Sequence, residues 1–267
     1  MHELPLVIFT VLSQLAVGGI VTLWWMDWKN TIQWKTGLLI SLSLVVIGGV
    51  AVLVSMFHLG HPFAAYRAIL NIKVSWLSRE VTFYGAFVGL SLLYTWFWFK
   101  DVSTWRGISG AIAAILGGIA IFSSAKIYMI PVIPAWNGMT TMMMFFLTSI
   151  LLGPLFVGLF LLIRGELSMK ITTFVLFGFI AAAIVMLLYF SGLQGGLPQA
   201  GESLRLMTGQ FIFWLRLFTF VIAFAILAIN SIGKQKQTGI TYSVVFLLLL
   251  ISEFLARFQF YETAVHL

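Results

Sequence analysis

Long apolar runs constrain what this chain can fold into more than any other feature of its sequence. Residues 37–57, GLLISLSLVVIGGVAVLVSMF, contain no charged side chain. A helix crosses the hydrocarbon core of a membrane with about 20 such residues, whereas a membrane β-strand needs only about 9–11. Because no water reaches the bilayer core, the backbone must satisfy its own hydrogen bonds there. The run therefore predicts a transmembrane helix.

Eight runs of this kind predict an all-α integral membrane protein, a bundle of eight transmembrane helices. The predicted spans cover residues 5–26, 37–57, 81–99, 107–129, 140–163, 170–190, 210–230 and 240–260. We expect residues 1–267 to form one polytopic domain. The first run lacks a basic region before it and a small-residue cleavage site after it, so we expect it to be retained.

The composition agrees with a membrane protein and excludes several kinds of chemistry. Only 9% of the residues are charged, against about 25% in soluble domains. The net charge of +7 is interpreted as a topology signal and not as nucleic-acid binding. The sequence has no cysteine, which excludes disulfides, cysteine-ligated iron–sulfur clusters and thiol catalysis within this chain.

Basic residues in the short connections predict the orientation of the bundle. Cytoplasmic loops of membrane proteins are enriched in lysine and arginine. Such residues occur in every second connection: Lys29, Lys35, Lys100, Arg106, Arg164, Lys170, Lys234 and Lys236. The connection IPVIPAWNG has none, and neither does the start of the chain. We therefore expect both termini on the extracytoplasmic side.

The connection at residues 58–80 is an exception to this charge pattern. It carries Arg67, Lys73 and Arg79 on the predicted outer side. Its stretch YRAILNIKVSWLSRE has apolar residues at a helix-like spacing, which indicates a short amphipathic helix at the membrane surface. Basic residues that break the topology pattern suggest a function other than topology.

Four charged residues lie inside predicted spans: Lys126, Arg216, Glu253 and Arg257. Each costs about 2.5–3.5 kcal/mol at the bilayer centre on insertion scales. Glu253 precedes Arg257 by four residues, an order that favours an ion pair along one helix. The two residues either form such a structural pair or line an internal cavity. Lys126 and Arg216 are expected to extend toward the outer interface.

The four histidines are poorly placed for haem or for a metal ion. His2 and His266 lie at the termini, while His58 and His61 lie together at one helix end. Haem ligation from facing membrane helices is not expected from these positions. Beyond Glu80 there is no obvious third ligand for a metal, so we predict no metal site.

His58 and Glu80 instead suggest proton-coupled chemistry at the membrane edge. A quinol releases protons when it is oxidised, and histidine is a natural proton acceptor at neutral pH. Pro62 disfavours a helical His61, so the helix is expected to end near Gly60 with His58 in its last turn. The alternative is that the histidines only cap helix carbonyls.

Several motifs resemble one known family. They are HELPL at residues 2–6, SMFHLGHP at 55–62, SWLSRE at 75–80, IPAWN at 133–137, GP at 153–154 and SEFLAR at 252–257. Lys126 and Tyr128 precede the fourth motif. In this order the motifs resemble the membrane anchor subunit of anaerobic dimethyl sulfoxide reductases, the DmsC family. The resemblance extends over essentially the whole chain.

The resemblance implies a three-subunit enzyme in the bacterial inner membrane. A molybdopterin subunit would reduce the substrate, and a ferredoxin-like subunit with [4Fe-4S] clusters would relay electrons. The anchor would oxidise menaquinol without haem or iron–sulfur clusters of its own. In the family, the residues matching His58 and Glu80 are implicated in quinol oxidation. Further quinol or partner contacts are suggested at His61, Arg67, Arg79, Lys126, Tyr128, Trp136, Glu253 and Arg257.

Two other classes of function fit the sequence less well. A transporter would explain charged residues within spans, but no internal repeat is found and the histidines lie at an edge. A purely structural anchor fits every feature except the residues of the 58–80 connection. The molybdenum subunit would select the terminal electron acceptor, so this chain does not identify it.

Overall fold

The computed structural model describes residues 4–56, 70–232 and 238–267, and within these ranges every regular element is a helix. The helices are α1 (Leu4–Trp28), α2 (Trp34–Met56), α4 (Trp76–Phe99), α5 (Ser103–Tyr128), α6 (Met139–Ile163), α7 (Met169–Gln194), α8 (Pro198–Gly209), α9 (Phe211–Ile232) and α10 (Gly239–Glu262). All except α8 are long and apolar enough to cross a membrane. The predicted eight spans are thereby confirmed, with α4 beginning five residues earlier, at Trp76 and not at residue 81.

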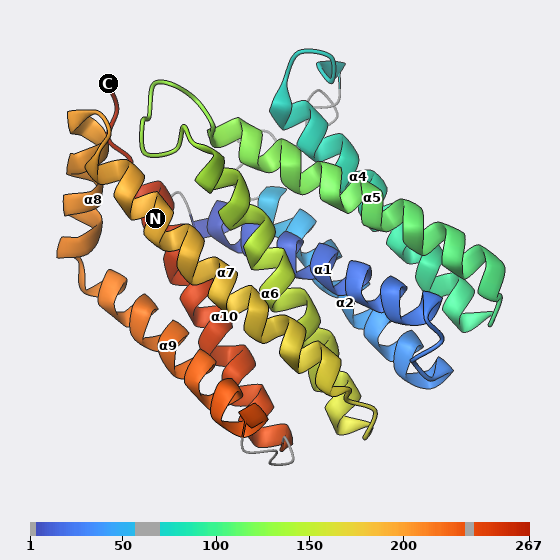
Figure 1. Ribbon diagram of the computed structural model, residues 1–267. Helices are drawn as coiled ribbons and strands as arrows, with labels where there is room; N and C mark the ends of the chain where they lie inside the picture. The colour runs from blue at the N-terminus through green and yellow to red at the C-terminus, as the bar shows by residue number, and fades with distance from the viewer. Residues whose placement is uncertain (1–3, 57–69, 233–237) are drawn as a thin grey trace.

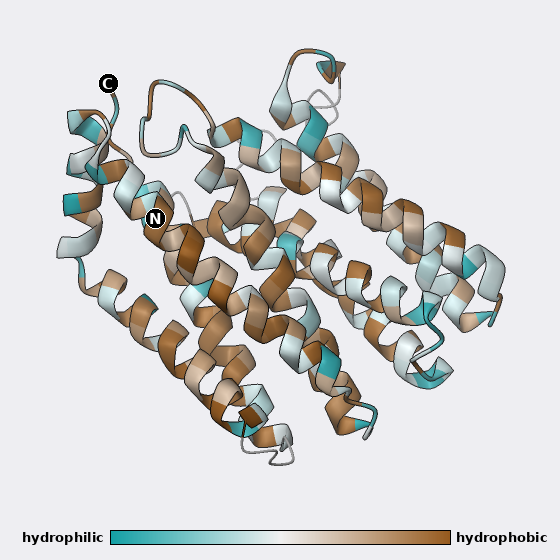
Figure 2. Ribbon diagram, viewed as in Figure 1, coloured by the Kyte–Doolittle hydropathy of each residue, from teal (hydrophilic) through white to brown (hydrophobic). Residues whose placement is uncertain are grey.

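Helix α8 is the element that the apolar runs did not predict. Its twelve residues are mostly polar or small, and Pro198 stands at its first turn, where the missing amide hydrogen costs nothing. Ala200, Ser203 and Met207 are buried on one side of it. Figure 2 shows the long helices mostly brown and α8 mostly white and teal.

Helix α1 lies at the centre of the bundle. It packs against α2, α5, α6 and α10 (Figure 1). Its contact with α6 is a backbone-to-backbone approach, because a Cβ added at Gly18 would overlap the Ser149 carbonyl and one at Gly153 would overlap Gly18. Small residues allow membrane helices to approach this closely. Helices α4 and α5 form a hairpin against one side of α1, and α9 and α10 form another at the far side of α6.

One end of the bundle gathers α8 and the chain terminus, and we call it the terminal end. Val265 donates its amide hydrogen to Ser203 of α8 at 3.1 Å. Leu267 donates to Val132, in the connection between α5 and α6, at 2.9 Å. Helix α1 begins at this end and α10 finishes there, as an even number of spans requires (Figure 1). Which end faces the cytoplasm stays a prediction.

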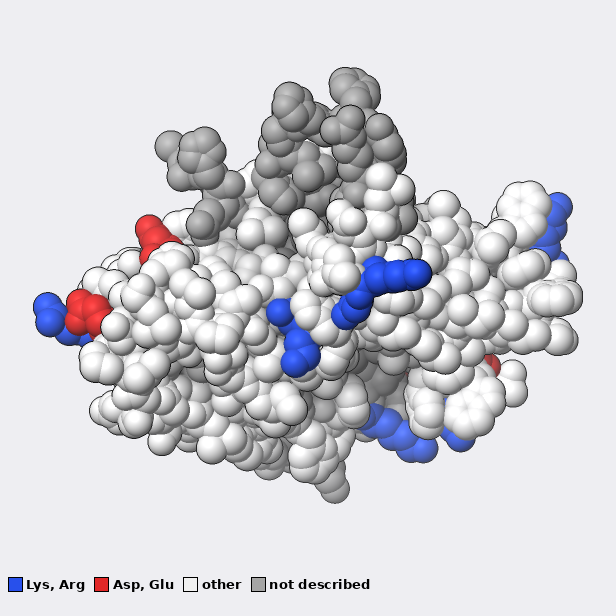
Figure 3. Space-filling model, turned by 90° about the horizontal axis from the view of Figure 1, so that it is seen from above, with Lys and Arg blue, Asp and Glu red and all other residues white. Residues whose placement is uncertain are grey.

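Tryptophan and lysine side chains meet at the opposite end. Lys29 lies 4.2 Å from the ring centre of Trp28, and Lys100 lies 4.9 Å from that of Trp96. Such pairs are typical of the membrane–water interface. Figure 3, a view of one face, shows only scattered charged side chains on a largely uncharged surface, as expected for a surface in contact with lipid.

Candidate functional site

Three of the predicted site residues lie outside the part of the chain that the structure describes. They are His58, His61 and Arg67, all within residues 57–69. The site is therefore built from Glu80, the other predicted residues and the neighbours that the structure brings to them.

Glu80 points into the bundle from the start of α4. The helix begins after Ser75, whose side chain accepts a hydrogen bond from the Ser78 amide. Glu80 is the fifth residue of the helix and is 7% exposed. None of the described cations lies within ion-pair distance of its carboxyl group. A carboxyl group buried without an ion pair is unusual and is a sign of function.

Arg79 points the other way and holds the preceding turn. Its Nε donates to the Ile72 carbonyl at 2.9 Å and its Nη2 to the Lys73 carbonyl at 2.7 Å. The guanidinium also lies 4.1 Å from the ring centre of Trp76. Arg79 therefore fixes the end of the 58–80 connection onto α4, which sets the direction of Glu80.

The Glu80 cavity is small and lies between α1, α4 and α5. It has a volume of about 10 Å³, which is room for about one water molecule. Its lining includes Phe9, Ser13, Gln14, Glu80, Tyr84 and Ser124. A quinol ring cannot enter a space of this size, so the cavity suits proton exchange and not binding of the whole ring.

An apolar groove begins beside this cavity. One part, of about 250 Å³, lies between α1, α5, α6 and α7. Val17 and Ile121 line both this part and the Glu80 cavity. A second part, of about 500 Å³, shares Thr22, Pro154 and Phe174 with the first and continues toward the end opposite α8. The groove is long, apolar and adjacent to Glu80.

Gln14 connects Glu80 to a second group of polar residues. It lies in the middle of α1 and is 1% exposed. Its Oε1 accepts a hydrogen bond from Nη2 of Arg257 at 3.1 Å. The Arg257 guanidinium, on α10, stacks 3.7 Å from the ring centre of Phe145. Gln14 thus belongs both to the lining of the Glu80 cavity and to the surroundings of Arg257.

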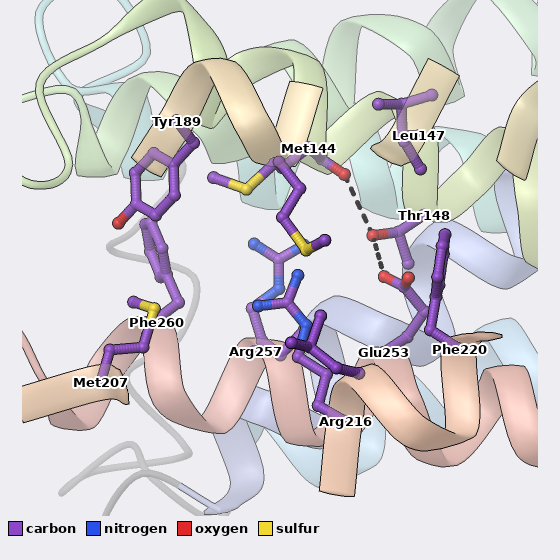
Figure 4. A pocket seen from close by; sticks show the side chains of 14 residues that line it. Met144, Leu147, Thr148, Tyr189, Met207, Arg216, Phe220, Glu253, Arg257 and Phe260 are labelled. Carbon is purple, nitrogen blue, oxygen red and sulfur yellow. Dashed lines mark hydrogen bonds between the residues drawn. The ribbon is translucent and has the colours of Figure 1, made fainter. Parts of the chain in front are cut away.

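The second cavity lies between α6, α7, α9 and α10 and measures about 60 Å³ (Figure 4). Arg216, Glu253 and Arg257 line it, and the figure shows the two guanidinium groups side by side. Glu253 forms no ion pair with Arg257; its Oε2 lies instead 2.7 Å from the Thr148 hydroxyl. Glu253 and Arg257 thus line a cavity and form no ion pair with each other; that this cavity holds quinol stays a prediction. Arg216 also faces this cavity, contrary to the expectation that it extends to the interface.

Tyr128 and Trp136 join an aromatic cluster at the terminal end. Their ring centres are 5.4 Å apart, and Trp136 stacks on Phe260 at 5.2 Å. Trp136 also donates from Nε1 to the Phe260 carbonyl at 2.8 Å. Tyr128 lies 5.2 Å from Tyr261. The cluster ties the connection between α5 and α6 to the last turns of α10, beside Arg257.

Lys126 lies apart from both cavities. It is half-buried in the last turn of α5, and its Nζ lies 5.9 Å from the ring centre of Phe122. A lysine near a helix end extends its ammonium group toward water along apolar neighbours. This position agrees with the expectation from the sequence.

Gln14 and Thr148 are the polar residues that the sequence did not single out. Both are uncharged residues within apolar runs, whereas the prediction weighed charged residues, histidines and residues of the family motifs. The signal was a lone glutamine in the stretch LSQLAV of the first run. Within the described residues, no group of three or more histidine, cysteine, aspartate or glutamate side chains could hold a metal ion.

Fold and site together define a polytopic helical membrane protein with buried polar cavities near one end of its bundle. A sequence model described as DMSO reductase anchor subunit (DmsC) matches residues 1–263. The chain therefore belongs to the DmsC family, as the motifs suggested. It is a multi-pass protein of the inner membrane, and its described residues contain eight helices long and apolar enough to span one.

Curated relatives agree with this assignment. The anaerobic dimethyl sulfoxide reductase chain YnfH of Escherichia coli is 31% identical over 160 residues, covering 58% of this chain and 56% of the relative. The C chain of the anaerobic dimethyl sulfoxide reductase of Haemophilus influenzae is 29% identical over 164 residues, with coverages of 57% and 56%. The corresponding chain of the Escherichia coli enzyme is 30% identical over 172 residues, with coverages of 61% and 59%. The aligned part thus spans less than two thirds of each relative.

Proposed function

We propose that this protein is the quinol-oxidising membrane anchor of a reductase of the dimethyl sulfoxide type. In this proposal it passes electrons from menaquinol to an iron–sulfur partner subunit, which supplies a molybdopterin catalytic subunit. The single observation that carries the proposal is Glu80, a buried carboxyl group without an ion pair among the described residues, at the terminal end of the bundle.

Glu80 is suited to accept a proton from a quinol bound at the mouth of the bundle. Oxidation of one quinol to a quinone releases two protons and two electrons. His58, at the start of the 58–80 connection, takes a proton first in this proposal, and Glu80, at its end, takes part in the release. General acid–base groups of this kind contribute about 10²–10⁴-fold to a rate. The two electrons pass to the iron–sulfur centre of the partner, since this chain has no cysteine to hold one.

The apolar groove supports the same proposal. A membrane quinol carries a long hydrocarbon tail, which needs an apolar path beside the reacting ring. The groove provides such a path and shares Val17 and Ile121 with the Glu80 cavity. We propose that the tail lies in this groove while the ring stays at the terminal end.

The test compares two electron donors in membranes that contain the assembled complex. Glu80→Gln keeps the size of the side chain and removes its capacity to accept a proton. We expect turnover with a menaquinol analogue to fall about 100-fold. Turnover with an artificial donor that reduces the partner's iron–sulfur centre directly is expected to stay at the wild-type level.

Glu202→Gln is the matched control, because Glu202 lies on α8 at the same end, its side chain is 45% exposed, and its contact with Arg205 is long, at 3.8 Å. This variant should behave as wild type with both donors. Full quinol-driven turnover in Glu80→Gln would contradict the proposal and favour a purely structural anchor. His58→Ala is measured in parallel, and loss of only the quinol-driven turnover places His58 in the same path.

A further inference from the structure

The amide of Gln14 carries a hydrogen-bond donor that no described residue satisfies. Its Nε2 is fully buried and has no partner in the described part of the protein. A buried donor without a partner costs about 1–3 kcal/mol, so native structures rarely keep one without a reason. The nitrogen belongs to a side chain that lines the Glu80 cavity.

Arg257 fixes which way this amide points. Oxygen and nitrogen of a glutamine amide are exchanged easily in assignment, and the hydrogen-bond network must decide between them. A guanidinium group can only donate, so the atom 3.1 Å from Arg257 Nη2 must be the oxygen. The nitrogen is then necessarily turned away from Arg257. Stacking of Arg257 on Phe145, at 3.7 Å, holds the guanidinium in this position.

Two other donors of the cavity lining are already in use. The Ser13 hydroxyl donates to the Thr10 carbonyl at 3.1 Å, and the Tyr84 hydroxyl donates to the Gly48 carbonyl at 3.4 Å. Gln14 Nε2 and the hydroxyl of Ser124, which also lines the cavity, therefore remain as donors, and of the two only Gln14 Nε2 is fully buried without any partner among the described residues. The volume of about 10 Å³ matches one water molecule, which needs two to four polar partners.

We propose that the Glu80 cavity is a binding site for a single water molecule, which accepts a hydrogen bond from Gln14 and donates one to Glu80. Gln14 is then a positioning residue for the proposed quinol reaction, and Arg257 acts through Gln14. The inference rests on the proposed function, in which Glu80 accepts a quinol proton. The water can take the proton from Glu80 inside the bundle. Glu80 can then release the proton without moving its own side chain.

Gln14→Glu is the sharpest variant for testing this inference. It keeps the size of the side chain and an oxygen for Arg257 to contact, and it removes the N–H donor; the negative charge that it adds lies beside the Arg257 guanidinium, which neutralises it. We expect kcat with a menaquinol analogue to fall about tenfold, less than the roughly 10²–10⁴-fold that a general acid–base group itself contributes, because Gln14 acts only through the water. The KM for quinol should stay unchanged, because Gln14 does not contact the ring. Turnover with the artificial donor should also stay unchanged.

A spectroscopic measurement provides a second readout. The infrared carboxyl band that disappears in Glu80→Gln is assigned to Glu80. In wild-type protein this band should be accompanied by an O–H stretching band of the bound water, which shifts when ordinary water is replaced by water labelled with oxygen-18; in Gln14→Glu that water band should be lost. Thr95→Val, on α4, is the control, because its hydroxyl donates to the Ser91 carbonyl at 2.9 Å and lines neither the Glu80 cavity nor the groove.

The outcomes separate this inference from the proposed function. Wild-type kcat in Gln14→Glu, together with loss of turnover in Glu80→Gln, overturns the water site alone. Wild-type turnover in both variants overturns the proposed function as well. Loss of turnover with both donors in Gln14→Glu also overturns the inference, because Gln14 would then serve assembly and not proton transfer.

Discussion

Asp27 and Arg106 form a buried ion pair at the end of the bundle opposite α8. Arg106 Nη2 lies 2.8 Å from Asp27 Oδ1, and the two side chains are 11% and 7% exposed. The Tyr94 hydroxyl lies 3.4 Å from the same carboxylate. Arg106 was used in the sequence as a topology signal, but in the structure it also joins α5 to α1.

Removing the carboxylate of Asp27 should destabilise the protein strongly. Asp27→Asn leaves the Arg106 guanidinium buried without its main partner, and breaking a buried pair in this way costs about 3–5 kcal/mol. We expect the free energy of unfolding in mixed detergent micelles to fall by that amount. Tryptophan fluorescence measures it, since the chain has 10 tryptophans.

Asp101→Asn is the matched control for this prediction. Asp101 contacts the same arginine at 3.2 Å, but its side chain is 68% exposed. Exposed pairs contribute about 0–1 kcal/mol. Asp101 has a positive φ of 54°, which asparagine also adopts readily. An equal loss in both variants would refute the view that burial of the Asp27 pair is what matters.

Single residues also show where prediction from the sequence ends. The spacing of Glu253 and Arg257 suggested an ion pair, yet Thr148 and Gln14 are the hydrogen-bond partners that the structure provides. Both partners lie far away in the sequence. A spacing of four residues shows which contact is possible along one helix, but not which partner from another helix is better placed.

At the level of elements, the spans were predictable and α8 was not. Each span contains an apolar run of about 20 residues, and its length alone identifies it. Helix α8 is short and polar, and only its packing against the rest of the bundle stabilises it. The close approach of α1 and α6 also depends on which of the 24 glycines face a neighbour, a property that the sequence does not reveal.

The apolar groove yields a prediction at the same level. Gly118, on α5, lines the part of the groove next to Glu80, and nothing lies within 4 Å of a Cβ added there. Gly118→Phe should therefore fill the groove without disturbing the helices. We expect a severalfold higher KM for a menaquinol with a long tail and an unchanged KM for a short-tailed analogue.

Gly85→Phe provides the comparison, because Gly85 is an exposed glycine of α4 that also has open space around it. This variant should leave both KM values at the wild-type level. If Gly118→Phe affects the long-tailed and short-tailed quinols equally, the groove does not hold the tail.

For the molecule as a whole, the orientation in the membrane is open to a direct test. The absence of cysteine allows single cysteines to be labelled without a background. Asn137, between α5 and α6, and Ser168, between α6 and α7, lie at opposite ends of the bundle, in connections that reach its surface. With both termini outside, a membrane-impermeant maleimide should label Asn137→Cys in intact spheroplasts and leave Ser168→Cys unlabelled.

Lysed spheroplasts supply the control, since both cysteines should then react. The reverse pattern in intact spheroplasts would show that the termini face the cytoplasm. It would also place Glu80 and the proposed quinol chemistry on the cytoplasmic side of the membrane.

The arrangement of the buried polar residues could not be predicted from the sequence, because these residues lie far apart along the chain. Glu80 was found from its motif and its charge. Its relation to Gln14 and Arg257 depends on the packing of α1 against both α4 and α10. No short pattern records such packing, because the partners come from opposite ends of the sequence.

The bond between Gln14 and Arg257 joins positions 243 residues apart, in the first and last helices of the chain. During synthesis, α1 enters the membrane long before α10 leaves the ribosome. Until α10 is inserted, the Gln14 side chain lacks the guanidinium group that it contacts in the folded protein. A chain that ends before α10 never forms this hydrogen bond. The hydrogen bond between the two helices therefore forms only after nearly the whole chain has been made.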